Sequence, residues 1–218
     1  MPAPPIPPTT IALITATLGR PRLLADLFAD VQAQTTMDLT WIVVTQDPAP
    51  SFTPASPKHW ATWDTSARYP VLDGFRRIVQ VHIPWQRGLA AARNPEVAVA
   101  WGLGCRYLAY ADDDDRLHAS YCARLGAALD AYPTASVAAC RIMDRGQVLH
   151  PLTHYSSCSR MARIEACATR PWRPTGPIMD TDYWRQFDDL ETVVVDSEPL
   201  YVCGNALTGG TRDATGAW

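Results

Sequence analysis

Residues 107 to 118 read Tyr-Leu-Ala-Tyr-Ala-Asp-Asp-Asp-Asp-Arg-Leu-His, so an apolar, strand-forming run leads directly into four consecutive aspartates. Adjacent carboxylates repel one another unless a positive charge lies close to them. A divalent cation such as Mg²⁺ or Mn²⁺ takes oxygen ligands of this kind, often together with substrate phosphates. The alternative is a solvated acidic turn that caps the next helix. Because ligand sites of open α/β sheets lie at the carboxyl ends of strands, we favour a site.

The composition is that of a globular protein with a sizeable core. The chain has 218 residues, 47% of them hydrophobic, and a net charge of −3, which argues against general nucleic-acid binding. The proline-rich residues 1–8 lack the basic region of a signal peptide and should form a flexible tail, and no apolar run is long enough to span a membrane. The six cysteines show no zinc spacing and should be reduced thiols. We therefore expect a cytoplasmic protein without a membrane span, and its oligomeric state stays open.

Strand and helix patterns alternate through most of the chain, which predicts an α/β fold with a mostly parallel central sheet flanked by helices. The expected strands are 10–15, 39–44, 78–83, 106–111, 136–143 and 192–195, and the expected helices are 22–34, 88–100, 121–132 and 180–187. We expect residues 9–218 to form one domain.

Two later segments are less regular. Residues 145–177 mix Gly, Pro, Ser and His without core periodicity, apart from a possible short helix at 161–168, and we expect them to form a mobile lid. Residues 197–218 form a glycine-rich tail.

Four stretches, taken in order along the chain, resemble family 2 glycosyltransferases of the GT-A fold. They are residues 14–21, the segment Gly88-Leu-Ala-Ala-Ala-Arg-Asn94, residues 107–121, and Asp180-Thr-Asp-Tyr-Trp184. The resemblance implies one GT-A domain, with a nucleotide-sugar half at about 9–118 and an acceptor half at about 119–218. It also implies a metal-dependent, inverting hexosyltransferase that uses Mn²⁺ or Mg²⁺ and a nucleotide-sugar, with a UDP-sugar as the expected donor. The acceptor is open.

The resemblance also assigns the aspartates. It implies that Asp112 faces the nucleotide ribose and shares the metal with Asp114, and that Asp113 belongs to the nucleotide site. Asp115 has either a role in the site or a role in capping the helix ahead of Tyr121.

Further nucleotide-binding residues follow from the other two motifs. The resemblance implies that Thr15, Thr17 and Arg20 line the nucleotide pocket, and that Arg93 and Asn94 face the same nucleotide. The two threonines could instead be ordinary turn hydroxyls, and Arg93 could pair with a surface acid.

Two positions depart from the family pattern. An acidic residue usually comes straight after the second strand, whereas here Asp47 arrives late and before Pro48. A late histidine near the diphosphate is also missing from residues 199–206, so Asn205 or a water would take its place.

The catalytic base is expected on the helix at 180–187. The resemblance implies that Asp180 is the base and that Asp182 is the second acid of the motif, while a capped helix start is the alternative. Trp184 lies four residues after Asp180 and should line the same face.

Two other classes of function remain open. A sugar-nucleotidyltransferase would need a glycine-rich loop after the first strand, where only Gly19 is found. A non-catalytic GT-A-like binding domain would have lost its acids, and they are present.

Overall fold

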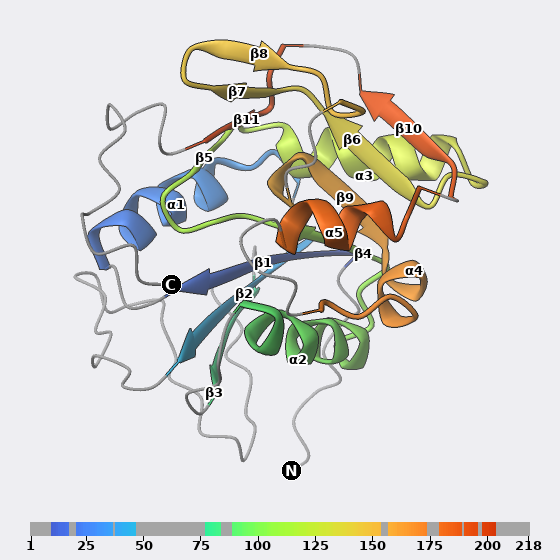
Figure 1. The fold of residues 1–218 in the computed structure, drawn as a ribbon. Helices are drawn as coiled ribbons and strands as arrows, with labels where there is room; N and C mark the ends of the chain where they lie inside the picture. Colours follow the sequence, from blue (N-terminus) through green and yellow to red (C-terminus); the bar gives the residue numbers. More distant parts are fainter. Residues whose placement is uncertain are drawn as a thin grey trace.

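A seven-stranded sheet with helices on both faces forms the centre of the molecule (Figure 1). The computed structural model describes residues 10–17, 21–36, 38–46, 77–83, 89–153, 157–173, 179–188, 190–195 and 198–203. The sheet has the order β10-β6-β9-β4-β1-β2-β3. Its strands are β1 (Ile11–Thr17), β2 (Leu39–Gln46), β3 (Arg77–Ile83), β4 (Tyr107–Tyr110), β6 (Val137–Cys140), β9 (Arg160–Arg163) and β10 (Thr192–Val195).

The predicted α/β fold with a mostly parallel sheet is confirmed. β3, β2, β1 and β4 are mutually parallel neighbours, and β10 is parallel to β6. Between these two groups lies β9, which is antiparallel to both β4 and β6. The helices are α1 (Pro21–Ala33), α2 (Leu89–Gly102), α3 (Tyr121–Ala131), α4 (Ile164–Ala168) and α5 (Met179–Arg185).

The helices divide between the two faces because successive strand residues point to opposite sides. Ile11 and Leu13 of β1 pack in one core with α1 and α3. Ala12 and Ile14 pack in a second core with α2, α4 and α5. Both faces of β1 are therefore shielded from solvent, as its continuous apolar sequence predicts.

A smaller, four-stranded sheet lies beside the first, in the order β5-β11-β7-β8 (Figure 1). Its strands are β5 (Arg116–Leu117), β7 (Ile142–Asp144), β8 (Gln147–Leu149) and β11 (Tyr201–Val202). Arg145 and Gly146 join β7 to β8 with φ angles of 48° and 75°, the left-handed region that a tight hairpin turn requires.

The structure corrects three predictions of secondary structure. The strand expected at 136–143 is two strands, because the chain leaves the large sheet after β6 and enters the small one as β7. Residues 160–163 are strand β9, and only Ile164–Ala168 of the proposed 161–168 helix is helical. The glycine-rich tail expected at 197–218 contains β11, while residues 204–218 lie outside the described part.

The lid interpretation of residues 145–177 is wrong for the segment 157–173. Met161 and Ala162 of β9 are fully buried in the centre of the large sheet, and Trp172 is buried in the core beneath it. This segment cannot open without breaking the hydrogen bonds of two neighbouring strands.

None of the helices in the described ranges is long and apolar enough to cross a bilayer. None of the six cysteines, all of which lie in the described ranges, forms a disulfide bond.

Candidate glycosyl-transfer site

The four aspartates connect the two sheets. β4 ends at Tyr110 in the large sheet, and Arg116 begins β5 in the small one. Within the connection, the Asp115 backbone N–H donates to the Asp112 carbonyl at 3.2 Å. At its exit, the Arg116 guanidinium donates to the Asp30 carboxylate of α1 at 2.6 and 2.7 Å. The turn is thus held at both ends by well-packed elements.

Asp113 points toward the end of β1. The Thr17 hydroxyl donates to Asp113 Oδ2 at 2.6 Å, and both side chains are buried. A charged acceptor makes this hydrogen bond a strong one. The pair ties the aspartate turn to the strand that also carries Thr15.

Asp115 is buried beneath the turn and bonded to β11. The Tyr201 hydroxyl donates to Asp115 Oδ2, and it accepts from the Asp112 backbone N–H at 3.3 Å. Burial, and then the Asp115 carboxylate, raise the pKa of Tyr201 well above its ordinary value, so the hydroxyl keeps its proton. The helix-capping role of Asp115 is wrong, because Ser120 occupies the N-cap of α3.

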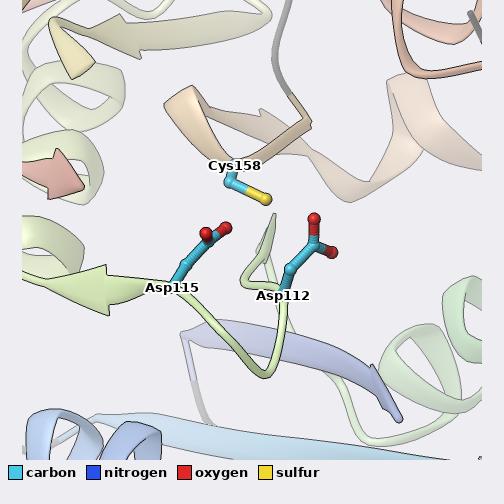
Figure 2. A group of neighbouring side chains, drawn as sticks. All are labelled: Asp112, Asp115 and Cys158. Atoms are coloured by element: carbon cyan, nitrogen blue, oxygen red, sulfur yellow. The ribbon is translucent and has the colours of Figure 1, made fainter. Parts of the chain in front are cut away.

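Asp112 and Asp115 converge with Cys158 of the 3₁₀ turn η2 (Ser157–Ser159). One ligand atom from each of the three side chains lies within 4.8 Å of the other two. Figure 2 shows Asp112 and Asp115 on one loop, with the Cys158 side chain directed toward them from a separate segment. Two carboxylates and a thiol are suitable donors for a divalent metal of borderline softness. This group overlaps the predicted metal pair only at Asp112, because Asp114 lies outside it.

Arg93 of α2 supplies positive charge to this end of the turn. It is 1% exposed, and its Nη2 donates to Asp112 Oδ1 at 2.8 Å. Its guanidinium carbon lies 4.7 Å from the Tyr110 ring centroid and 4.4 Å from that of Trp172. The interpretation of Arg93 as half of a surface ion pair is therefore wrong.

Asn94 binds the backbone of Trp172 in both directions. Its Nδ2 donates to the Trp172 carbonyl at 3.0 Å, and its Oδ1 accepts from the Trp172 N–H at 2.8 Å. Both polar atoms of the Asn94 side chain are thus engaged by the protein.

The remaining predicted residues are distributed as follows. Thr15 is fully buried, and its hydroxyl accepts from Trp41 Nε1 at 2.9 Å. This hydrogen bond joins the side chains of β1 and β2. Asp114 is half-buried in the turn. Arg20, Asp47 and Asn205 lie outside the described residues.

Helix α5 carries the predicted base. Asp180 lies in its first turn. Asp182 is half-buried, and its Oδ1 lies 4.0 Å from Arg185 Nη1. Trp184 is fully buried against Tyr183 and Phe187, so its predicted role as a wall of the site is wrong.

Solved structures of known proteins share this fold. TarS 1-349 from S. aureus in complex with UDP-GlcNAc matches with a TM-score of 0.65 and 11% identity, over 96% of this chain and 62% of that one. Mannosyltransferase PcManGT from Pyrobaculum calidifontis, in complex with GDP-Man and Mn²⁺, matches with a TM-score of 0.63 and 14% identity, over 90% and 59%. The fold is the GT-A fold of glycosyltransferases.

The similarity to GT-A structures covers part of the known chains and is a similarity of structure. The chain spans only about three-fifths of the length of the TarS 1-349 and PcManGT chains. No protein-family model and no curated protein matches the sequence.

The sequence predictions gave no site role to three residues that organise the candidate site, namely Cys158, Trp172 and Tyr201. Cys158 and Trp172 lie in residues 145–177, which were predicted to be irregular, and Tyr201 lies in the predicted tail. The available signal for Trp172 was composition, since eight tryptophans are many for 218 residues. Aromatic residues in an apparent loop are a reason to expect buried structure there.

Proposed function

We propose that this chain is a metal-dependent, inverting glycosyltransferase that moves a sugar from a nucleotide-diphosphate donor to a nucleophilic acceptor. The observation that carries the proposal is the convergence of Asp112 and Asp115 at the carboxyl end of β4, in a GT-A fold. The bound UDP-GlcNAc and GDP-Man of the two similar structures support a nucleotide-sugar donor. The proposed organisation is a nucleotide-sugar half at about 9–118 and an acceptor half at about 119–218.

The described residues fit a divalent metal. Asp112, Asp115 and Cys158 would hold it, with Asp114 as an additional carboxylate from the same turn. The Mn²⁺ in the mannosyltransferase structure supports Mn²⁺, and Mg²⁺ is the other candidate. A metal at this position would stabilise the negative charge that develops on the diphosphate leaving group.

The protein residues around the turn would prepare the donor site. Arg93 and the Thr17–Asp113 bond hold the aspartate turn in one conformation. A fixed turn lowers the reorganisation that donor binding requires. A UDP-sugar remains the proposed donor, and Arg20 and Asp47 are proposed as further nucleotide-binding residues.

Asp180 is the proposed general base. Its carboxylate would accept the proton of an attacking hydroxyl. Attack from the side opposite the leaving group inverts the anomeric centre. Asp182 is proposed as the second acid of the same helix.

Titration calorimetry with UDP and with GDP, each with and without Mn²⁺, tests the donor site. We expect UDP to bind more tightly than GDP, binding to require Mn²⁺, and Asp112→Asn to weaken it at least tenfold. Asp26→Asn, an exposed acid of α1, is the matched control. Equal binding by the Asp112→Asn variant would contradict the proposed site.

Activity assays separate the proposed function from the two alternatives. A transferase should hydrolyse its nucleotide-sugar slowly without acceptor and release the nucleoside diphosphate. A nucleotidyltransferase would instead form the nucleotide-sugar from a nucleoside triphosphate and a sugar phosphate. Binding of UDP and Mn²⁺ without either reaction, across a panel of nucleotide-sugars, would support a binding domain.

A further inference from the structure

Trp172 lies at the centre of a stack of side chains that runs from the aspartate turn to helix α5. On one side of its indole ring lies the Arg93 guanidinium, 4.4 Å from the ring centroid. On the other side lies the Tyr183 ring, 3.9 Å away between centroids and inclined by only 9°. The stack therefore joins α2 to α5 through one residue that belongs to neither helix.

The position of Trp172 is fixed in every direction. Asn94 holds both polar groups of its backbone. Its Nε1 donates to the Tyr110 hydroxyl at 2.9 Å, and the two rings meet edge to face. A tryptophan that is 2% exposed and held by four separate contacts has little freedom to move.

Each end of the stack leads to an element that carries a proposed site residue. At one end, Arg93 donates to the Asp112 carboxylate. At the other end, Tyr183 follows Asp180 by three residues on α5, so the position of the Tyr183 ring sets the position of the helix that carries Asp180.

Simple packing does not account for a cation in this stack. Burying a guanidinium carries a large desolvation cost, and an apolar residue of similar volume often stabilises such a position better. Arginine is therefore costly for stability here. What it adds is a rigid, planar link that stacks on an indole and donates to a carboxylate at the same time.

We propose that Trp172 is a positioning residue that couples the Asp112 carboxylate to helix α5, and through α5 to Asp180. This inference rests on the proposed function for its catalytic meaning, but the coupling itself is a property of the protein without ligand. The proposal predicts that a substitution at Asp112 alters the amide exchange of α5 only when the indole of Trp172 is present.

A double-mutant cycle read by amide hydrogen exchange tests the coupling. Asp112→Ala removes the charge partner of Arg93 and should speed exchange of the α5 amides severalfold, because the first link of the stack loosens. Trp172→Leu should speed it about tenfold or more. In the double variant, Asp112→Ala should add nothing further. Additive effects in the double variant, or no response of α5 to Asp112→Ala, would overturn the proposal.

Two further variants separate coupling from general loosening of the core. Leu103→Ala truncates a residue of the same core outside the stack, so its effect should simply add to that of Asp112→Ala. Trp172→Phe keeps an aromatic ring between Arg93 and Tyr183 but loses the bond to Tyr110, and it should retain most of the coupling. If Trp172→Leu does not fold, Tyr183→Leu removes the next ring of the stack and completes the same cycle.

A kinetic measurement then tests whether the coupling between Asp112 and α5 contributes to catalysis. With UDP and Mn²⁺ as the binding probe, Trp172→Leu should change the Kd less than threefold, because Tyr110 still stacks on Arg93. With UDP-GlcNAc as the hydrolysis probe, its kcat should fall at least tenfold while KM changes little. If no variant, including the wild type, hydrolyses any nucleotide-sugar, the proposed function fails and the exchange cycle still decides the coupling. A rise in KM with an unchanged kcat would contradict a role in positioning α5.

Discussion

Cys158 is the residue at which this site differs most from an all-oxygen metal site. A thiolate favours softer divalent ions, so Cys158→Ser should lower the affinity for Zn²⁺ or Cd²⁺ about tenfold or more and change that for Mg²⁺ little. Cys105→Ser, a buried cysteine outside the group, serves as the control. Competition with a chromophoric chelator measures both affinities. An equal loss for all the metals would show that the thiol contributes only packing.

Glu96 of α2 should make the stability of the protein depend on pH. Among the described residues, neither of its carboxylate oxygens has a hydrogen-bond partner, and burial raises its pKa from 4.5 to about 8, opposed by Arg93. The folded protein therefore binds this proton more tightly than the unfolded chain does. Its contribution is fully present below pH 4.5, and the free energy of unfolding falls as the pH rises from there to about 8.

Urea unfolding at several pH values between 5 and 8 tests the role of Glu96. Glu96→Gln, which cannot ionise, should remove a pH-dependent loss on the order of a few kcal/mol. Glu165→Gln, on the exposed side of α4, should leave the wild-type dependence in place. Parallel curves for wild type and Glu96→Gln would mean that Glu96 is ionised in the folded protein.

At the scale of elements, helix α5 decides which aspartate can act as base. Residues two apart on a helix point about 200° away from each other, so Asp180 and Asp182 cannot both face one substrate atom. Asp182 already lies 4.0 Å from Arg185, which favours Asp180. Asp180→Asn should lower kcat about 10²- to 10⁴-fold with little change in donor affinity, and Asp182→Asn far less. The reverse order of effects would move the base to Asp182.

Strand β9 should behave as core. Met161→Ala truncates a fully buried side chain in a central strand and should cost about 2 to 5 kcal/mol of stability. Leu152→Ala, in the exposed loop after β8, should change stability by less than about 0.5 kcal/mol. Chemical unfolding of both variants provides the comparison. A small effect of Met161→Ala would reinstate the lid interpretation.

At the scale of the whole molecule, Mn²⁺ and UDP bound at the aspartate turn should stabilise both sheets together. The aspartate turn connects the large sheet to the small one, and Tyr201 of the small sheet bonds to it. Mn²⁺ with UDP, at a hundred times the Kd, should raise the free energy of unfolding by about 2.7 kcal/mol in a single transition. Thermal unfolding with and without EDTA measures this. Two separate transitions, of which only one responds, would show that the sheets unfold independently.

Local pattern alone was sufficient for the main elements of the fold. The apolar runs of β1, β2 and β4 and the helical spacing in α1 and α3 are visible in the chain, because both depend on neighbours within a few residues. The convergence of carboxylates at the end of β4 follows from the same local signal. The GT-A expectation drew in addition on four ordered motifs.

Only the tertiary structure decided how the site is assembled. Thr17 and Asp113 are separated by 96 residues, and Tyr201 and Asp115 by 86, so no local pattern relates them. β9 escaped prediction because its four residues, Arg-Met-Ala-Arg, are too few to distinguish a strand from a helix, and its two neighbours in the sheet determine its conformation. The sequence determined which residues carry charge and which prefer burial. The pairing of distant segments determined that Asp112 meets Cys158 and that Arg93 stacks on Trp172.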